Sequence, residues 1–304
     1  MNRINYSVSL GKIKFSNPLL AASGTFGYGK EFSSVSALSS WGGFITKTLT
    51  LNPRRGNPVP RIYEVRSGVI NSIGLENEGL KNFLDNKVAL IKKYKTKVIV
   101  SIYGEDQKQW LSLIEGITSV ISGNIIGLEL NFSCPNVHGK IISHDKILVK
   151  KILKALRKKT SKMLIPKLSF SPNIEQIAKV CEDYGADAVT VMNTVSAIAL
   201  DINTKKPILG NIFGGLSGPA IKHIAQAAVY KTYKKISIPI LASGGVFDYK
   251  DVLEFMLAGA TLVQLGTVNF TDTDISKNIL KGVNSYLLAN KYKSIQKIIG
   301  AANV

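Results

Sequence analysis

The sequence predicts a single α/β domain, residues 1–304, folded as a closed (β/α)8 TIM barrel. Short apolar runs rich in β-branched residues alternate with longer amphipathic stretches along the whole chain, which is the pattern of βαβ units. Eight such units fit into 304 residues without a break in composition. Polar and glycine-rich segments follow the strands, where the active-site face of such a barrel lies.

The expected elements can be placed in chain order. The strands are Leu19–Ala22, Phe44–Thr46, Val98–Ile102, Gly127–Asn131, Met163–Leu168, Ala188–Met192, Pro239–Ala242 and Leu262–Leu265. The clearest helical patterns are Leu80–Tyr94, Gln107–Val120, Lys146–Lys158, Ile174–Tyr184, Pro219–Tyr233 and Tyr249–Ala258. A doubly wound sheet is the rival fold, but its GxGxxG fingerprint is absent, because Gly24, Gly27 and Gly29 have the wrong spacing.

One excursion is expected to be long, an insertion at about residues 49–77 after the second strand. Connections of this length in a compact domain are usually functional or form an interface. Separately, an active-site loop is expected at about residues 132–144 after the fourth strand, and we expect it to close as a lid.

Composition and charge exclude several classes of protein. Lys and Arg number 39 against 20 Asp and Glu, a net charge of +19, yet the lysines are scattered over the predicted helices without a recognition helix or stacking motif. The lysines are therefore expected to serve solvation of the surface, and no specific nucleic-acid partner is expected. No apolar run spans a bilayer and the N-terminus lacks a signal peptide, so a cytoplasmic protein without a membrane segment is expected.

The cysteine count excludes a disulfide scaffold and a four-cysteine cluster, because only Cys134 and Cys181 are present. Cys134 follows a predicted strand within the segment Asn131-Phe-Ser-Cys-Pro-Asn136, flanked by polar residues. A cysteine there can act as nucleophile or general base. Cys181 lies among apolar residues of a predicted helix and is expected to be a buried hydrophobe.

Other polar residues end predicted strands. Lys47 and Lys167 offer fixed positive charge for an anionic substrate or cofactor. Asn71, Asn131 and Asn193, with Thr194, supply donors and acceptors suited to a planar amide-bearing molecule. Ser243-Gly244-Gly245 and Gly266-Thr267 follow the last two strands, which is the recurrent phosphate site of barrels. No metal site is expected.

Five segments carry a resemblance to a known family. They are ASGTFGYG at 22–29, NSIGL at 71–75, ELNFSCPNV at 129–137, GGLSGPAIK at 214–222 and AGATLVQLGT at 258–267. With them the chain resembles the class 1 dihydroorotate dehydrogenases, FMN-dependent barrel enzymes of pyrimidine synthesis that oxidise dihydroorotate to orotate. SGTFGYG and GGLSGPAIK are similar to the 1B subclass, whose partner subunit carries FAD and a [2Fe–2S] cluster and passes electrons to NAD⁺.

The resemblance implies a role for each matching residue. Cys134 is the expected catalytic base, and Lys47 is expected to act with it in catalysis. The residues expected at the substrate are Lys47, Asn71, Ser72, Ile73, Gly74, Leu75, Asn131, Asn193 and Thr194. Those expected at FMN are Ser23, Lys47, Thr48, Asn131, Lys167, Met192, Gly218, Gly244, Gly245, Gly266 and Thr267. A heterotetramer built on a dimer of this chain is also implied.

The chain departs from the family pattern at two places. It has Ser101 where the family usually has Asn, and the stretch 137–141 lacks the usual KHGG form. The alternatives left open are a dihydropyrimidine-dehydrogenase-like flavoprotein acting on uracil or thymine, a fumarate-linked class 1A enzyme, and a basic RNA-binding or scaffolding protein. The missing membrane segment argues against the quinone-linked class 2.

Overall fold

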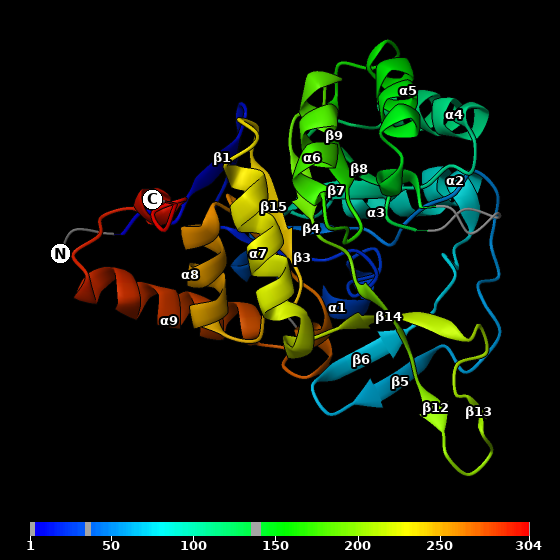
Figure 1. The fold of residues 1–304 in the computed structure, drawn as a ribbon. Helices are drawn as coiled ribbons and strands as arrows, with labels where there is room; N and C mark the ends of the chain where they lie inside the picture. Colours follow the sequence, from blue (N-terminus) through cyan, green and yellow to red (C-terminus); the bar gives the residue numbers. More distant parts are fainter. Residues whose placement is uncertain (1–3, 34–37, 135–140, 304) are drawn as a thin grey trace.

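A closed barrel of eight parallel strands forms the centre of the computed structural model, which describes residues 4–33, 38–134 and 141–303 (Figure 1). Around the barrel the strands run β10 (Val189–Val191), β15 (Ile240–Ser243), β16 (Leu262–Leu265), β3 (Leu19–Ala21), β4 (Gly43–Ile45), β7 (Lys97–Ile102), β8 (Ile125–Asn131) and β9 (Met163–Lys167). The predicted fold class is confirmed, and each of the eight expected strands is present. Buried branched residues on both faces explain these short parallel strands.

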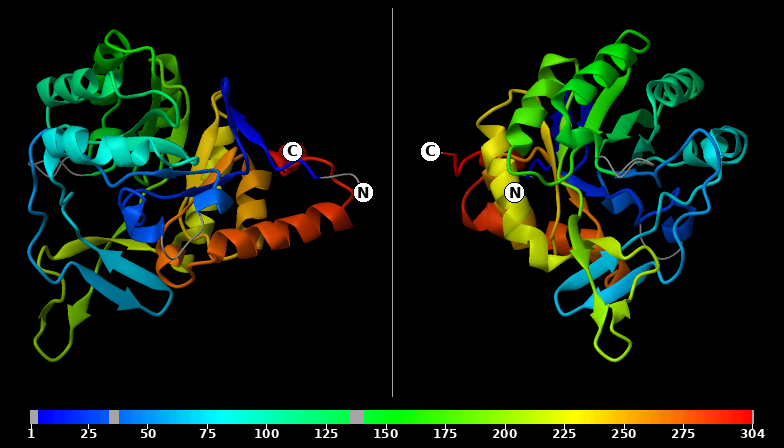
Figure 2. Two further views of the ribbon diagram at one scale, coloured as in Figure 1. Left: turned by 180° about the vertical axis from the view of Figure 1, so that it is seen from behind. Right: turned by 45° about the vertical axis from the view of Figure 1, so that its right-hand side comes forward.

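Helices cover the outside of the barrel (Figure 2). They are α4 (Gln107–Thr118), α5 (Lys146–Arg157), α6 (Ile174–Asp183), α7 (Lys222–Tyr233), α8 (Tyr249–Ala258) and α9 (Ile275–Ala289), and each packs on the next. The pattern at 80–94 forms three short pieces: α2 (Gly79–Asn82), the π-helical turn η2 (Phe83–Lys87) and α3 (Val88–Ile91). Short 3₁₀ turns and one α-turn complete the connections: α1 (Lys30–Ser33), η1 (Leu38–Ser40), η3 (Ile142–His144), η4 (Pro219–Ile221), η5 (Thr267–Phe270) and η6 (Ile295–Ile298).

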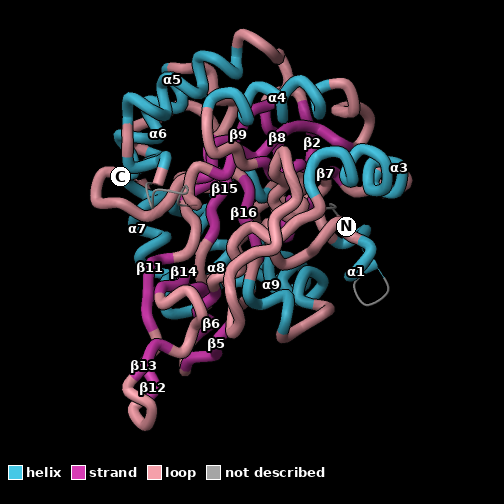
Figure 3. Tube along the Cα trace, turned by 90° about the vertical axis from the view of Figure 1, so that its right-hand side faces the viewer, coloured by secondary structure: helices cyan, strands magenta, loops and turns pink. Residues whose placement is uncertain are grey.

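A four-stranded antiparallel sheet projects from the barrel (Figure 3). Its order is β11 (Val195–Ile198), β14 (Phe213–Ser217), β6 (Gly68–Asn71) and β5 (Ile62–Val65), and a small hairpin of β12 (Leu200–Asp201) and β13 (Lys206–Pro207) extends it. Residues 49–77, expected as an insertion, supply β5 and β6. A second excursion, after β10, supplies β11 and β14 and pairs Gly215 with Asn71. This excursion was not predicted from the sequence.

Packed aromatic rings fix the ends of β7 and β8. Trp110 on α4 meets Phe132 edge-on, with ring centroids 5.4 Å apart, and meets Tyr103 at 6.1 Å. All three side chains are fully buried. An N-terminal hairpin of β1 (Val8–Leu10) and β2 (Ile13–Phe15) adds Val8, Leu10 and Phe15 to the core. The packed rings of Trp110, Tyr103 and Phe132 therefore position the segment that leads from β8 to Cys134.

Candidate active site

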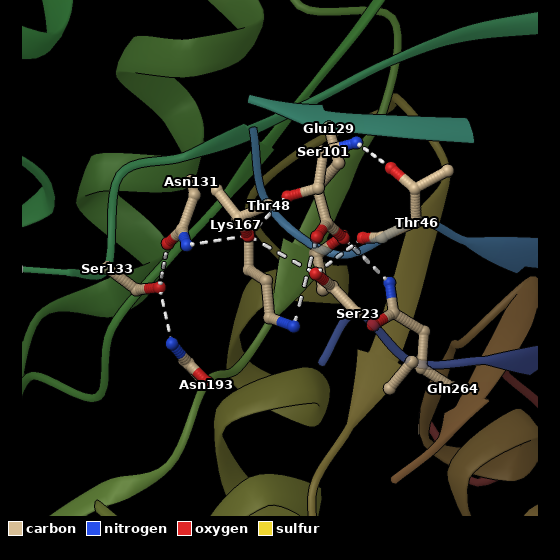
Figure 4. Close-up of polar contacts among 12 residues, drawn as sticks. Ser23, Thr46, Thr48, Ser101, Glu129, Asn131, Ser133, Lys167, Asn193 and Gln264 are labelled. Carbon is tan, nitrogen blue, oxygen red and sulfur yellow. Dashed lines mark hydrogen bonds and ion pairs between the residues drawn. The ribbon is translucent and has the colours of Figure 1, made fainter. Parts of the chain in front are cut away.

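Polar side chains gather where the barrel strands end, and Thr48 is the centre of one group (Figure 4). Its Oγ1 lies 3.2 Å from Ser23 Oγ and 2.9 Å from Ser101 Oγ, and it accepts a hydrogen bond from Asn131 Nδ2 at 3.3 Å. Ser23 also donates to the backbone carbonyl of Thr46 at 2.7 Å. Three strand ends, β3, β4 and β7, are thereby joined to β8.

Ser101 has a structural role within this group. Its side chain is fully buried, its hydroxyl is engaged by Thr48, and its backbone N–H donates to Thr46 Oγ1 at 3.1 Å. A serine is shorter than the asparagine usual in the resembled family. In this chain the residue therefore orients Thr48 from below.

A second polar chain connects Cys134 to β10. Asn131 Nδ2 donates to Cys134 Sγ at 3.3 Å, and its Oδ1 accepts from Ser133 Oγ at 2.7 Å. Ser133 Oγ in turn accepts from Asn193 Nδ2 at 2.6 Å. Asn131 and Asn193, both expected in the site, are thus brought together by Ser133, which was not singled out beforehand.

The Cys134 thiol is half-buried, and its surroundings pull its acidity in both directions. Burial raises the pKa of Cys134 above its ordinary value, because the protein disfavours the thiolate relative to water. The hydrogen bond from Asn131 and the charges of Lys167 and Arg54 lower the pKa but do not reverse the shift. Residues 135–140 of the expected active-site loop lie outside the described residues.

Lys167 ends β9 inside the barrel and is 5% exposed. Its Nζ lies 3.9 Å from Glu129 Oε1, and the Glu129 side chain is fully buried on β8. Lys47 is half-buried at the end of β4, with its backbone N–H bound to the carbonyl of Gly27. Both lysines therefore lie where the sequence placed them, at strand ends of one face.

Glycine loops after β15 and β16 bring backbone close to that face. Gly244 and Gly245 have φ values of 124° and 81°, and a Cβ on Gly245 would come within 2.6 Å of the Lys222 backbone. A Cβ on Gly266 would meet only side-chain carbons of Ala22 and Thr25, at 3.8 and 4.0 Å. Only glycine permits the first loop, and the second leaves its backbone accessible.

The same loops are tied to the projecting sheet. Thr267 Oγ1 donates to Ser217 Oγ at 2.7 Å, next to Gly218 (φ 101°). Met192, buried at the end of β10, donates its N–H to the carbonyl of Ser243 at 3.1 Å. Backbone amides, hydroxyls and two lysines thus surround one end of the barrel, and this donor set fits the phosphate and polar ring edge of FMN.

The segment 71–75 reaches the site through the sheet. Asn71 Nδ2 donates to the Gly215 carbonyl at 3.3 Å, and Gly215 packs so closely on Thr194 that a Cβ there would clash with its hydroxyl. Ser72 Oγ accepts from the side chains of Asn57 and Asn211. The half-buried Ile73 leads into Gly74 and Leu75, whose φ values of 76° and 55° turn the chain sharply. The expected substrate-side residues therefore follow or end β4, β6, β8 and β10, and the sheet links Asn71 to Thr194 through Gly215.

The described residues offer neither a metal site nor a membrane span, and their second cysteine is buried. No group of His, Cys, Asp and Glu suited to a metal ion occurs in the part of the chain that the structure describes. Within those same residues, no helix has the length and hydropathy needed to cross a bilayer. Cys181 is completely buried on α6, and burial raises its pKa, so its thiol is protonated and inert.

Four buried polar residues around the site were not predicted from the sequence. Ser133 appeared inside a recognised motif, and its position between Asn131 and Cys134 was the available signal. Glu129, Thr190 and Gln264 lie inside strands that read as apolar, and nothing in a single sequence distinguishes an inward from an outward side chain when both faces are buried.

Comparison with known proteins agrees with this geometry. The family model described as dihydroorotate dehydrogenase matches residues 6–287. A protein of Caldicellulosiruptor bescii named dihydroorotate dehydrogenase B (NAD(+)), catalytic subunit, is 42% identical over 99% of this chain and 100% of its own. Its namesake in Geotalea daltonii is 41% identical over all of both chains. By these matches over nearly its full length, the chain belongs to the dihydroorotate dehydrogenase family.

Proposed function

We propose that this chain is the catalytic subunit of an NAD⁺-linked dihydroorotate dehydrogenase. It oxidises (S)-dihydroorotate to orotate in de novo pyrimidine (UMP) biosynthesis. The observation that carries the proposal is the Cys134 thiol, held by the Asn131 amide at the end of β8 beside a cluster of polar strand ends. Relatives named for this activity, about 40% identical along their full length, support it.

Cys134 removes the proton from C5 of dihydroorotate as general base. Its thiolate is the competent form, and the Asn131 hydrogen bond and the nearby Lys167 and Arg54 charges favour that form. Bound FMN supplies the acceptor for the hydride that leaves C6. The loop expected to exclude water, at about residues 132–144, includes residues 135–140, which lie outside the described residues.

The other residues bind and orient. Lys47 would bind substrate and cofactor together, and Lys167 would offer positive charge to the cofactor. We assign the substrate to Lys47, Asn71, Ser72, Ile73, Gly74, Leu75, Asn131, Asn193 and Thr194. We assign FMN to Ser23, Lys47, Thr48, Asn131, Lys167, Met192, Gly218, Gly244, Gly245, Gly266 and Thr267. The glycine loops and the Thr267–Ser217 pair support the second assignment.

A partner subunit completes the electron path in this proposal. The relatives are named catalytic subunits, which supports a separate subunit; that it bears FAD and a [2Fe–2S] cluster, in a heterotetramer on a dimer of this chain, is our further proposal. Exposed apolar side chains on the projecting sheet and its edges, among them Ile198, Leu200, Ile212 and Phe213, suit association with another chain. The cytoplasmic location stays a prediction, and cell fractionation tests it.

One experiment tests the core of the proposal. The purified chain is expected to be yellow, to release about one FMN per chain and no nicotinamide, and to convert dihydroorotate to orotate with an artificial acceptor. Uracil and thymine serve as the competing substrates. A colourless protein, FAD in place of FMN, or turnover of uracil but not dihydroorotate would contradict it, the last outcome favouring the dihydropyrimidine-dehydrogenase-like alternative.

A further inference from the structure

Three polar side chains form a layer across the barrel interior, directly beneath the strand ends. Glu129 on β8 accepts hydrogen bonds at Oε2 from Thr190 Oγ1 on β10, at 3.1 Å, and from Gln264 Nε2 on β16, at 3.0 Å. Gln264 Nε2 also donates to Thr190 at 3.2 Å. Alternate strands contribute each layer of such a barrel, and branched apolar residues usually fill it. A layer built around a carboxylate is therefore a departure that packing does not require.

The second carboxylate oxygen is the informative one. Glu129 Oε1 is buried without a hydrogen-bond partner among the described residues, and Lys167 Nζ is the one cation within 4.0 Å of it there, at 3.9 Å. A buried carboxylate is costly unless a charge compensates it. Among the described residues the Lys167 ammonium makes the ion pair with Glu129 and no hydrogen bond, and Figure 4 shows it among the polar side chains of the site.

We propose that Glu129 is a positioning residue that acts through Lys167. It holds the ammonium at the floor of the site and offsets part of the positive charge that Lys167 presents to FMN. The inference rests on the proposed function, because it needs FMN at this end of the barrel. Its consequence is that Glu129 lowers the reduction potential of the bound flavin, since a less positive surrounding stabilises the negatively charged reduced form less.

The charged and titratable groups facing Lys167 support this reading. On β8 there is Glu129, and beyond that strand the Cys134 thiol, whose pKa the Lys167 charge lowers. On the other side β10 presents the uncharged Thr190, which pairs with Lys167 in register. Across the barrel β16 presents the uncharged Gln264. Glu129 is thus the sole carboxylate in contact with Lys167 among the described residues.

The test is the midpoint potential of bound FMN in the holoenzyme, measured by reduction against reference dyes. Glu129→Gln keeps the shape of the side chain, and its amide can bind the unpaired Gln264 Oε1. It is expected to raise the potential, seen as an increase of about tenfold in the preference for reduced over oxidised FMN. Thr190→Val, the matched control, removes one hydrogen bond of Glu129 but no charge, and should leave the preference within about twofold.

The Lys167→Met background shows whether Glu129 acts through Lys167. Lys167→Met alone should lower the potential, and adding Glu129→Gln should then change it much less than it does in the wild-type background. An unchanged or lowered potential in Glu129→Gln, or the same rise in both backgrounds, would overturn the inference. A wild-type protein that binds no FMN would instead overturn the proposed function.

A second measurement needs no flavin and covers the case in which Glu129→Gln fails to fold. Lys167→Met leaves the Glu129 carboxylate buried without its counter-charge, which costs free energy in the folded state. The apoprotein of this variant should therefore unfold at a lower denaturant concentration than wild type at neutral pH. Lys47→Met, which has no carboxylate partner among the described residues, is the control and should lose less stability. Equal losses of stability in the two variants would overturn the pairing.

Discussion

The neighbours of Cys134, which we propose as the catalytic base, act on its acidity in opposite directions. The sulfur accepts a hydrogen bond from Asn131 at 3.3 Å and lies near the charges of Lys167 and Arg54, yet burial outweighs them and its pKa remains raised. As a base, such a thiol is expected to act at the alkaline end of the ordinary range. Cys181, with the same functional group, is fully buried, and burial is the one influence on its pKa among the described residues.

Replacing the thiol should separate chemistry from cofactor binding. Cys134→Ala is expected to lower the rate of dihydroorotate oxidation by about a hundredfold or more, the usual contribution of a positioned base, while FMN stays bound. Cys181→Ala is the matched control and should retain the rate. Steady-state assays with an artificial acceptor, together with the flavin spectrum, check both. Full activity of Cys134→Ala would remove the residue from the mechanism.

The pH profile should carry the signature of the same group. Because the thiolate is the active form and burial raises the pKa of Cys134, activity should rise with pH and continue to rise beyond the ordinary cysteine pKa of 9.0. Cys134→Ser, with a less acidic hydroxyl, should keep some activity only at the alkaline end. The measurement is kcat/KM against pH for both proteins, because this ratio reports the pKa of the free enzyme. A wild-type rate that is flat from neutral to alkaline pH would contradict the assignment.

A role for Ser133 in orienting the two amides is suggested by the structure and not by the sequence. Its hydroxyl connects Asn131 and Asn193, at 2.7 and 2.6 Å, and so orients both amides. Ser133→Ala should raise the KM for dihydroorotate by about fivefold, the cost of one or two hydrogen bonds, with the flavin spectrum unchanged. Ser285→Ala, whose hydroxyl binds only a carbonyl of its own helix, is the control. Equal KM values for the two variants would show that Ser133 orients nothing.

At the scale of elements, the site is made by loops whose shape depends on glycine and on charge pairs beneath them. Gly245 lies against the backbone of Lys222, whose Nζ binds Asp251 Oδ1 at 2.8 Å. Asp251 Oδ2 accepts from the N–H groups of Phe247 and Asp248 and so caps the start of α8. The loop after β15, the start of α7 and the start of α8 therefore form one connected unit around the proposed phosphate position.

Gly245→Ala tests that unit. The added Cβ would lie 2.6 Å from the Lys222 backbone at a φ of 81°, so the loop must move. Affinity for FMN should fall by at least about tenfold. The free energy of unfolding should also fall, by roughly 1–2 kcal/mol, because an alanine pays this cost in left-handed backbone. Gly123→Ala is the control: Gly123 has a φ of 65° and open space around it, so this variant should lose stability but keep its affinity for FMN. Flavin retention on dilution and thermal unfolding distinguish them; equal FMN affinity in both would contradict the loop assignment.

At the scale of the whole molecule, two excursions from the barrel meet over the site. The segment 49–77 and the segment after β10 pair through β6 and β14, which links Asn71 with Gly215, and Gly215 packs against Thr194. The hairpin of β12 and β13 that extends this sheet leaves large apolar side chains in solvent, for example Ile202 in its turn, 87% exposed. Residues that we propose for the substrate and the surface that we propose for association are therefore parts of one projecting structure.

The cysteine inventory sets the electron path of the isolated chain. A [2Fe–2S] centre normally takes four cysteines, and this chain has two. The chain alone should therefore reduce artificial acceptors but turn over NAD⁺ poorly, and coexpression with an electron-transfer subunit should restore NAD⁺ reduction. Orotate formation with each acceptor measures this. Efficient NAD⁺ turnover by the isolated chain would contradict the prediction, and fumarate turnover would indicate the 1A alternative.

The sequence by itself determined the barrel, because each strand is a short run of branched apolar residues, a local property that a single chain displays. It also determined most of the proposed site, since Lys47, Asn131, Lys167 and the glycines at 244–245 and 266 follow those runs and the ends of parallel strands share one face. The local pattern of the sequence was therefore sufficient to predict both the barrel and most of the proposed site.

Tertiary structure decided what depends on distant partners. The pairing of Gly215 with Asn71 joins residues far apart in the chain. Neither strand has the apolar alternation that would predict this pairing from the sequence. The hydroxyl of Ser133 gains its role from Asn193, on another strand. Glu129 lies in a strand buried on both faces, so no periodicity tells that its carboxylate points inward toward Lys167. Which side chains meet across a barrel is set by strand order and register, and these exist only once the sheet has closed.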